Sequence, residues 1–595
     1  MNAPMLHAMT PPLAPFVDAL PLPSRLIASE RDGRLTVRIR AGEHRFHRDL
    51  PVSRIWGFEG MVPGPTIEAE RGRPVTVEWR NELEGPFPVV DTVAPEPANA
   101  DGVPVQCLPG LSDGKPGRDA AGLTGHTVVH LHGGLTPAVY DGWAENLFAP
   151  GQPAVFHYPM NQRAALLWYH DHVMGITKLD VYAGLAGLWT VRDDRERDLG
   201  LPEGPPFEVP LLIQDRNFDL DEQGRLTDRL LHKTDPDVME AFPPFTVVNG
   251  KVWPVLEVRP ATYRFRVLNG SNARTYRLVL LRDRAPELER ITQIGTDHGL
   301  LRAPVAVPAN GLVLASAERA DVLVDFSDLE PGTELTLLNT ARAPFDGSSF
   351  PAADAEHAAD LDGLLPYPQV MRLRVSAGDV ARRSIPRTLA TDYESPTPEV
   401  LAKAPRRAIA LIEREIDGET NMLTMRELES VDAEYTGPVV TVVDDEETTR
   451  YRVVAAHFED TTTFFPMLGE YEVWQLINLT GDTHPIHVHL DPFQILARHP
   501  IRYDIPDAGI RERDLAATVR LERDPGDELD HAIADNERGL KDTIRVNPNE
   551  IVEIAVRFNS YSGRYMYHCH ILDHEDRDTM RPFVTMAPEL MPFMA

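Results

Sequence analysis

Cysteine is scarce in this sequence, which contains only Cys107 and Cys569 among its 595 residues. Two cysteines can form at most one disulfide bond, so a fold held together by several disulfides is excluded. Long hydrophobic runs are also missing, and no stretch approaches the ~20 apolar residues that span a membrane. The N-terminus has no basic start followed by an apolar core and no twin-arginine pair. We therefore expect a cytoplasmic protein with no secretory signal.

Basic residues are outnumbered, with 59 Lys and Arg against 91 Asp and Glu, which gives a net charge of −32. Because phosphate binding needs clustered Lys and Arg, this balance disfavours a nucleic-acid partner. Charged residues are 25% and hydrophobic residues 42% of the chain, as in folded globular proteins. The length predicts roughly three or four domains. The 53 prolines favour turns and edge positions between short strands, so we expect an all-β fold.

One strand pattern occurs three times in the chain. The copies are PGPTIEAERGRPVTVEWRN (63–81), WPVLEVRPATYRFRVLN (253–269) and GEYEVWQLIN (469–478). Each alternates apolar and polar residues and ends at an asparagine, which is typical of half-buried strands. Charged or proline-rich stretches separate the copies. We therefore predict three related β-domains and one linker: residues 1–195, 206–376, 377–405 (the linker) and 406–595.

The middle copy differs from the late copy at one informative position. Thr275 follows the asparagine of the middle copy by six residues, where the late copy has His484. We therefore predict that the domain at 206–376 carries no metal ligand and serves as a structural spacer.

Histidine is the residue whose distribution is uneven. Ten of the 21 histidines fall in the four short segments VVHLHGG, WYHDH, THPIHVHL and RYMYHCHILDHED. They are His130, His132, His170, His172, His484, His487, His489, His568, His570 and His574. Residues two apart on a strand project from one face, so each His-x-His pair offers two imidazoles in the same direction. Imidazole suits copper, zinc, iron and nickel, so the histidines predict a metal centre without choosing the metal.

The position of Cys569 indicates that the metal is copper. Cys569 stands between His568 and His570 and therefore points to the opposite strand face from both. A trigonal site of two histidines and one thiolate with a weak axial ligand is the blue-copper arrangement, and His484, Cys569 and His574 supply its three strong ligands. The remaining eight histidines are enough for three further copper ions.

With these segments in this order, the chain resembles the multicopper oxidases, the laccase-like family built from three cupredoxin-like Greek-key β-barrel domains. It is most similar to the bacterial phenoxazinone synthases, which oxidise o-aminophenols, and to the spore-coat laccases. WYHDH, VNGKVWP, SNARTY and YSGRYMYHCHILDHED carry the likeness to both groups, and RLLHKT (229–234) and RPFVTMAPE favour the phenoxazinone synthases. The resemblance implies four copper ions per chain. It also leaves open self-association and, as an alternative location, a spore coat.

The resemblance implies a role for each site residue. His484, Cys569 and His574 would hold the type 1 copper, and His130 and His487 the type 2 copper. The type 3 pair would be held by His132, His170, His172, His489, His568 and His570. Asp141 and Glu575 would relay protons to reduced oxygen. The alternative for both acids is that they only orient ligand histidines.

The axial ligand of the type 1 copper is left open. The family usually places a methionine or an apolar residue ten positions after the cysteine, where this chain has Thr579, followed by Met580. Either Met580 reaches the copper and joins the metal ligands, or Thr579 leaves the axial position weak or vacant. Axial identity tunes the reduction potential.

Several functions compete for this ligand set. The first is oxidation of phenols or o-aminophenols by dioxygen, which is reduced to water, with phenoxazinone-type or other coupled products. A spore-coat-type laccase or bilirubin oxidase is the second. A cuprous-ion oxidase for copper tolerance would favour a methionine-rich insert, and the 16 methionines form no such cluster. A non-catalytic electron-transfer protein would leave eight histidines unexplained, and a zinc hydrolase would leave Cys569 unexplained.

Overall fold

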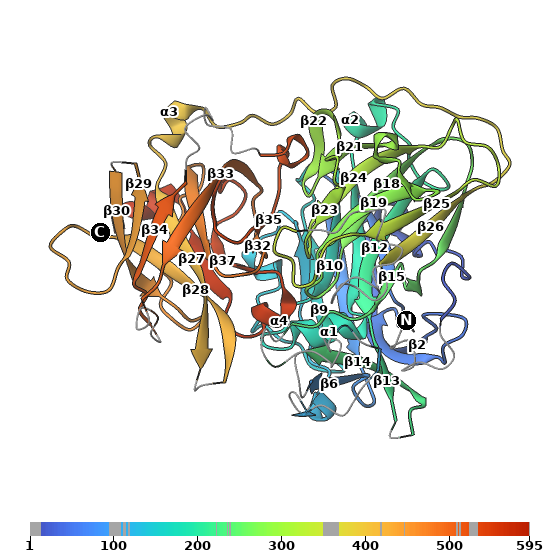
Figure 1. The fold of residues 1–595 in the computed structure, drawn as a ribbon, viewed down its shortest axis with the longest axis horizontal. Helices are drawn as coiled ribbons and strands as arrows, with labels where there is room; N and C mark the ends of the chain where they lie inside the picture. Colours follow the sequence, from blue (N-terminus) through green and yellow to red (C-terminus); the bar gives the residue numbers. More distant parts are fainter. Residues whose placement is uncertain are drawn as a thin grey trace.

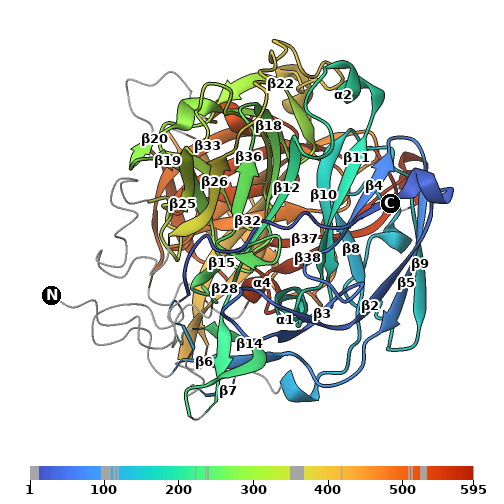
Figure 2. The same ribbon diagram turned by 90° about the vertical axis from the view of Figure 1, so that its right-hand side faces the viewer.

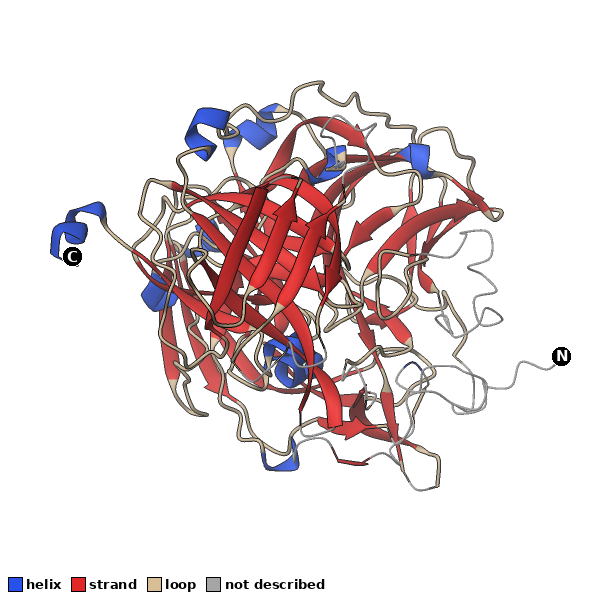
Figure 3. Cartoon of the chain, turned by 60° about the vertical axis from the view of Figure 1, so that its left-hand side comes forward, coloured by secondary structure: helices blue, strands red, loops and turns tan. Residues whose placement is uncertain are grey.

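The chain in this computed structural model consists mainly of β-strands, as the sequence predicts (Figure 3). The structure describes residues 13–593, apart from 95–106, 108, 111–114, 117–119, 222, 235, 237–239, 349–367, 417–418, 446, 507–509, 511–512 and 523–532. None of the helices that it describes is long and apolar enough to cross a membrane.

The N-terminal part contains two sheets. The five-stranded sheet has the order β1 (Arg25–Ile27), β4 (Gly64–Glu70), β11 (Ala186–Arg192), β10 (Ala165–Asp171) and β8 (Val129–His132). The four-stranded sheet has the order β3 (Ser53–Phe58), β2 (Arg34–His44), β5 (Val75–Glu82) and β9 (Pro153–Tyr158). In β5 the side chains of Val75, Val77 and Trp79 are buried, which confirms the alternation that the sequence predicts.

The middle part also contains two sheets. The larger runs β16 (Lys251–Val252), β15 (Phe245–Val248), β12 (Glu208–Arg216), β18 (Thr262–Asn269), β24 (Arg319–Asp325), β21 (Ile291–Thr296) and β22 (Gly299–Ala306). The other runs β17 (Val255–Val258), β26 (Gln369–Val375), β25 (Glu334–Asn339), β19 (Tyr276–Arg282) and β20 (Ala285–Pro286), with β23 (Leu312–Leu314) paired to β19.

The expectation of a half-buried strand at 253–269 is wrong for β18. All eight of its residues are buried, because ion pairs cover the face that the sequence presents as polar. Arg266 Nε lies 2.6 Å from a carboxylate oxygen of Glu208, and Arg264 Nη2 lies 2.5 Å from Asp321. Buried Arg side chains are tolerated where carboxylates pair with them.

The C-terminal part is a closed barrel packed beside a smaller sheet. The barrel runs β27 (Arg406–Ile416), β28 (Glu419–Ser430), β30 (Glu447–Ala455), β29 (Val440–Asp444), β34 (Ala517–Leu521), β33 (Phe493–Asp504), β36 (Glu550–Arg557) and β31 (Tyr471–Leu479). The sheet runs β35 (Thr543–Val546), β32 (His484–Val488), β37 (Gly563–Cys569) and β38 (Met580–Thr585). In Figure 1 the barrel strands lie on the left and the strands of the N-terminal and middle parts on the right.

A shared sheet and a hydrophobic cluster are among the contacts that join the N-terminal and middle parts. One sheet contains strands of both, in the order β13 (Phe218–Leu220), β14 (Leu226–Thr234), β6 (Val89–Val93) and β7 (Lys115–Pro116). A hydrophobic cluster that includes Leu166, Leu188 and Leu212 packs β10 and β11 against β12, and the ribbons of these strands lie near one another in Figure 2. The N-terminal and middle parts therefore pack against each other as one continuous body. The predicted domain bounds, with breaks at 195–206 and 377–405, stay a prediction.

The helices are short segments that connect strands (Figure 3). The α-helices are α1 (Thr177–Ala183), α2 (Asp194–Asp198), α3 (Pro398–Leu401) and α4 (Leu572–Glu575). The 3-10 turns are η1 (Ala28–Arg31), η3 (Ala120–Gly122), η4 (Ala138–Tyr140), η5 (Leu288–Arg290), η7 (Asp535–Glu537) and η8 (Pro588–Phe593). The helix α4 follows β37 directly and lies between the two halves of Figure 1.

Candidate metal centre

Two pairs of adjacent strands carry the histidine segments. On β8 and β10, His130 lies directly opposite His170. On β32 and β37, His487 lies directly opposite His568. A further histidine stands two residues after each of these four and projects from the same face. The strand register therefore points both sets of imidazoles into one space between the N-terminal and C-terminal parts.

Eight histidines meet in that space in one buried cluster. They are His130, His132, His170, His172, His487, His489, His568 and His570. Rings from the two ends of the chain stack directly: the centroids of His132 and His487 are 3.6 Å apart, and those of His130 and His489 are 4.0 Å apart. The sequence predicts these eight residues as one set, and the structure brings all of them together.

The inward-facing ring nitrogens of the cluster converge. Among the described residues, none forms a hydrogen bond to His130 Nε2, His132 Nδ1, His170 Nε2, His487 Nε2 or His570 Nε2. The Nε2 atoms of His172 and His489 both lie 3.3 Å from His568 Nε2. A buried polar atom without a partner is costly, and a metal ion would satisfy these nitrogens. The donor set therefore fits metal ions.

Burial keeps these imidazoles in the form that binds metals. It lowers the pKa of His130 and His132 well below the ordinary value. It also lowers the pKa of His172 to about 4 and the pKa of His570 to about 3. In these last two residues, charge repulsion from neighbouring histidines adds to the effect of burial. The neutral imidazole, which burial favours, is the metal ligand.

The outward nitrogens of the same rings are held by the protein. His130 Nδ1 donates to the carbonyl oxygen of Asp141 at 2.6 Å, and His170 Nδ1 donates to that of Asp171 at 2.8 Å. His487 Nδ1 donates to the carbonyl oxygen of Asp542 at 2.8 Å. Such contacts fix the tautomer and the ring orientation of a metal-binding histidine.

Asp141 and Glu575, the two acids predicted from sequence, both touch the cluster. His489 Nδ1 lies 2.7 Å from Asp141 Oδ2. The two oxygens of Glu575 lie 3.4 Å from His172 Nδ1 and 3.1 Å from His568 Nδ1. Burial raises the pKa of Asp141 well above its usual range. Burial also acts to raise the pKa of Glu575, but His568 and His172 outweigh it and hold that pKa at about 2.

Asp542 also belongs to the site, and sequence reasoning missed it. Its Oδ1 lies 3.1 Å from His132 Nε2, and its Oδ2 lies 3.0 Å from His298 Nε2. Arg319 donates to both carboxylate oxygens, with Nη1 2.6 Å from Oδ1. Burial acts to raise the pKa of Asp542, but Arg319 and His132 hold it well below its usual range. Because these partners are remote in sequence, no local spacing could have identified this acid.

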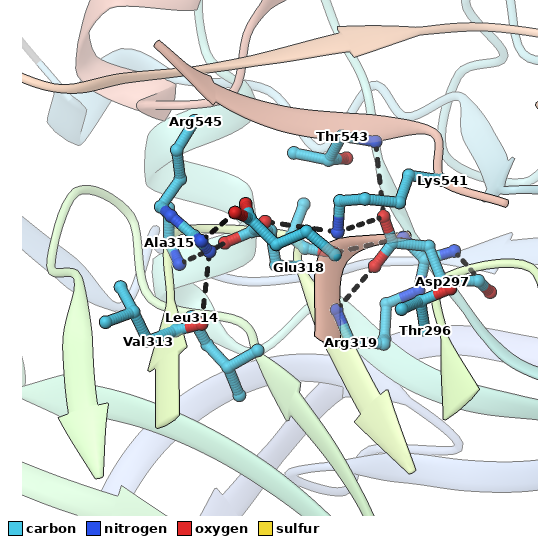
Figure 4. A network of polar contacts seen from close by, with 12 residues as sticks. Thr296, Asp297, Val313, Leu314, Ala315, Glu318, Arg319, Lys541, Thr543 and Arg545 are labelled. Atoms are coloured by element: carbon cyan, nitrogen blue, oxygen red, sulfur yellow. Dashed lines mark hydrogen bonds and ion pairs between the residues drawn. The ribbon is translucent and has the colours of Figure 1, made fainter. Parts of the chain in front are cut away.

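A network of buried charges lies beside Asp542 and extends into the middle part, and Figure 4 shows its members Asp297, Glu318, Lys541 and Arg545. Lys541 Nζ lies 3.1 Å from Asp297 and 3.2 Å from Glu318, and Arg545 forms a further ion pair with Glu318. Asp297 and Glu318 come from the middle part, whereas Lys541 and Arg545 come from the C-terminal part. The middle part therefore contributes charged residues beside the site, in addition to the spacer role that the sequence predicts.

A second group forms on the opposite face of the sheet that contains β32 and β37. The possible ligand atoms of His484, Cys569 and His574 all lie within 4.8 Å of one another and are buried. The register pairs Cys569 with Ile486, whereas His568 pairs with His487. The alternation predicted from the position of Cys569 is therefore present, with the three-residue group on one face and the histidine cluster on the other.

The second group also has donor atoms suited to a metal. No hydrogen bond reaches His484 Nδ1 from the described residues, whereas its Nε2 lies 2.7 Å from the Thr480 hydroxyl. Burial lowers the pKa of His484 and raises the pKa of the Cys569 thiol. A bound metal reverses the second effect because it holds a coordinating thiol as the thiolate. His574 Nε2 lies 3.4 Å from Glu240 Oε1.

The placement of Met580 disagrees with its prediction as a ligand of this group. The register sets Met580 directly opposite His568, and its side chain packs with Trp143 and Met566. Because opposite residues of an antiparallel pair project from one face, Met580 lies on the side of the histidine cluster.

The comparisons with known proteins identify the family. Two family models of multicopper oxidases match the chain, one over residues 433–589 and the other over 41–110 and 121–196. The chain belongs to the multicopper oxidase family. It is therefore a copper-dependent oxidoreductase that uses oxygen, with cupredoxin-like β-domains and copper of types 1, 2 and 3.

Particular relatives extend over nearly the whole chain. It is 36% identical over 591 residues to a laccase of Bacillus subtilis (strain 168), and the alignment covers 96% of this chain and 98% of that laccase. It is also 36% identical over 592 residues to a laccase of Bacillus stratosphericus, with 96% and 99% covered. The crystal structure of a multi-copper oxidase from Pediococcus acidilactici matches 97% of this chain and 93% of its own, with 26% identity and a TM-score of 0.65.

Proposed function

We propose that this protein oxidises phenolic or o-aminophenolic substrates one electron at a time and uses the electrons to reduce dioxygen to water. One observation carries the proposal: a single sheet bears a histidine-cysteine group on one face and half of an eight-histidine cluster on the other. The similarity to laccases supports the same class of reaction. Substrate oxidation would take place at the first group and oxygen reduction at the second.

The ligand assignment is the one that the family resemblance implies, and the ring nitrogens without hydrogen-bond partners among the described residues support it. His484, Cys569 and His574 would hold the type 1 copper, and His130 and His487, through Nε2, the type 2 copper. One type 3 copper would be held by the converging Nε2 atoms of His172, His489 and His568. The other would be held by His132 Nδ1, His170 Nε2 and His570 Nε2. When bound, the copper ions supply the one-electron chemistry.

The residues around the ions would transfer electrons between the two sites and deliver protons. Cys569 is bonded through the backbone to His568 and His570, so a covalent route joins the two faces. Asp141 Oδ2 faces His489, and Glu575 faces His172 and His568. We propose that these two acids deliver protons at the cluster, because each has a carboxylate oxygen beside the ligands and reduced oxygen must take up protons.

The first experiment measures copper content, the visible and electron paramagnetic resonance spectra, and oxygen uptake with o-aminophenol, a methoxyphenol and bilirubin in parallel. We expect four copper ions per chain, an intense thiolate-to-copper band, a type 2 signal, and faster oxygen uptake with the first two reductants than with bilirubin. A colourless protein that holds its full copper and takes up no oxygen would refute the proposal.

The role of the two acids needs variants that keep the shape of the side chain. In Asp141→Asn and Glu575→Gln we expect anaerobic bleaching of the blue band by substrate to keep its rate, and reoxidation by oxygen to slow by roughly 100-fold. The surface variant Asp228→Asn, which loses an exposed pair with Arg54, is the control. Loss of copper from the cluster, with normal reoxidation per copper, would instead show that the acids only orient ligands.

A further inference from the structure

The strand register decides which side chain shares the face of Cys569. The strands β37 and β38 are antiparallel, and their last pair sets His568 opposite Met580. One step further along, the Cys569 N–H donates to the carbonyl oxygen of Thr579 at 3.0 Å. Cys569 therefore stands opposite Thr579, and the side chains of such a pair lie on one face.

Met580 is engaged on the other face. It is 3% exposed and belongs to a hydrophobic cluster with Trp143, Phe458 and Met566. Met566 comes two residues before His568 on β37 and so shares its face. To bring the Met580 thioether to the face of Cys569, the pairing of β38 with β37 would have to slip by one residue. Such a slip would turn every side chain of β38 to the wrong face.

The Thr579 side chain has an unsatisfied polar atom. Thr579 is fully buried, and within the described part of the chain no group forms a hydrogen bond to its Oγ1. Leaving a buried hydroxyl unpaired costs about 1–3 kcal/mol. This hydroxyl lies on the face where His484, Cys569 and His574 converge. A weak contact to a metal ion at that group would give it a partner.

We propose that Thr579, and not Met580, takes the axial position of the type 1 copper, which therefore has no thioether ligand. The proposal rests on the proposed function, because it needs copper at the group of His484, Cys569 and His574. The axial residue tunes the reduction potential of such a site, and loss of a fourth donor favours the reduced ion because it needs fewer ligands than the oxidised ion. A short hydroxyl side chain donates less, so the reduction potential is higher than it would be with methionine.

The presence of Thr579 at the axial position affects which substrates the enzyme can oxidise. A higher potential at the electron-accepting copper increases the driving force for one-electron oxidation. Reductants that give up an electron less readily than o-aminophenols, such as phenols with few electron-donating groups, then come within reach. We therefore expect the substrate range to extend to simple phenols.

The test compares Thr579→Met with Met580→Leu. The reduction potential is measured by redox titration of the blue band, and the axial environment by electron paramagnetic resonance, in protein whose copper content and thermal midpoint are also determined. In Thr579→Met we expect the potential to fall enough to change the equilibrium constant for electron uptake about tenfold, which is ~60 mV for a one-electron couple. In Met580→Leu, a substitution that keeps the packing volume, we expect no shift of the potential and an unchanged spectrum.

Each result decides between the two residues. A shift of the potential in Met580→Leu, or no shift in Thr579→Met, would overturn the proposal. If Thr579→Met does not hold copper, Met580→Leu still gives the answer, because a methionine ligand cannot be replaced by leucine without changing the spectrum. A wild-type protein with full copper and no blue band would refute the proposed function itself, which is a different outcome from a blue protein that responds to the wrong substitution.

Discussion

Replacement of Asp542 by asparagine removes the carboxylate that links the histidine cluster to the buried charges. Asp542 is 1% exposed, and both of its oxygens accept from Arg319, which is itself buried. Removing one partner of a buried ion pair costs about 3–5 kcal/mol because the other charge is left uncompensated. Arg319 keeps hydrogen bonds to the carbonyl oxygens of Leu166, Ala317 and Asp297. We therefore expect the lower end, about 3 kcal/mol.

The same substitution should weaken copper binding. Asp542 Oδ1 accepts from His132 Nε2, and this contact leaves His132 Nδ1 as the nitrogen free for a metal. Loss of such a supporting carboxylate typically reduces metal affinity by ~10–100-fold. A competition titration against a chelator measures this effect separately from the stability of the fold.

The stability assay is urea unfolding of copper-free Asp542→Asn and wild-type protein. The matched control is Glu522→Gln, which breaks an exposed pair with Arg502 and should change the free energy of unfolding by no more than about 1 kcal/mol. If copper-free Asp542→Asn unfolds within ~1 kcal/mol of wild type, the buried pair does not stabilise the fold as argued. An unchanged copper affinity would likewise refute the role given to its contact with His132.

Three further predictions concern other parts of the structure. Gly133 has φ +82°, and an added Cβ would stand 2.8 Å from Arg319 Nη2. The added Cβ of Gly72→Ala meets no atom within 4 Å, so this control should cost only the ~1–2 kcal/mol of its left-handed backbone. We therefore expect Gly133→Ala to lower the free energy of unfolding by more than Gly72→Ala does. Burial acts to lower the pKa of His232, but the carboxylates of Asp573 and Asp91 raise it to about 9. Its stabilising contribution, roughly 3 kcal/mol, is therefore complete below pH 6.5 and lost as the pH rises through 9, and unfolding of His232→Gln should lack this pH dependence. Copper removal should lower the calorimetric midpoint, since ligand at ~1,000 times its dissociation constant stabilises by about 4 kcal/mol, and equal midpoints would contradict a folded-state site.

The residue spacing of the histidine segments was sufficient to predict the main features of the site. A strand repeats every two residues, so His-x-His puts two imidazoles on one face, and Cys569 between His568 and His570 must point to the other. These relations are local, and the structure retains them. The prediction of an all-β fold rested on the many prolines, and the local alternation of residues such as those of β5 supported the individual strands.

Features that depend on long-range pairing could not be read from the sequence. Asp542 meets His132 and Arg319 only after distant strands have come together. The choice between Thr579 and Met580 depends on the register of β38 against β37, which no count of residues from the cysteine determines. The arginines of β18 look like a solvent-facing pattern, and only the carboxylates of other elements make their burial possible.

The distribution of the site along the chain has a consequence for maturation. The three residues of the mononuclear group all lie between 484 and 574, whereas the eight-histidine cluster takes four members from 130–172 and four from 487–570. The mononuclear site can thus fill as soon as the C-terminal part has folded, but the cluster closes only when the two ends of the chain have docked. A chain whose C-terminal part has folded before the N-terminal part docks is therefore expected to be blue and to hold less than its full copper.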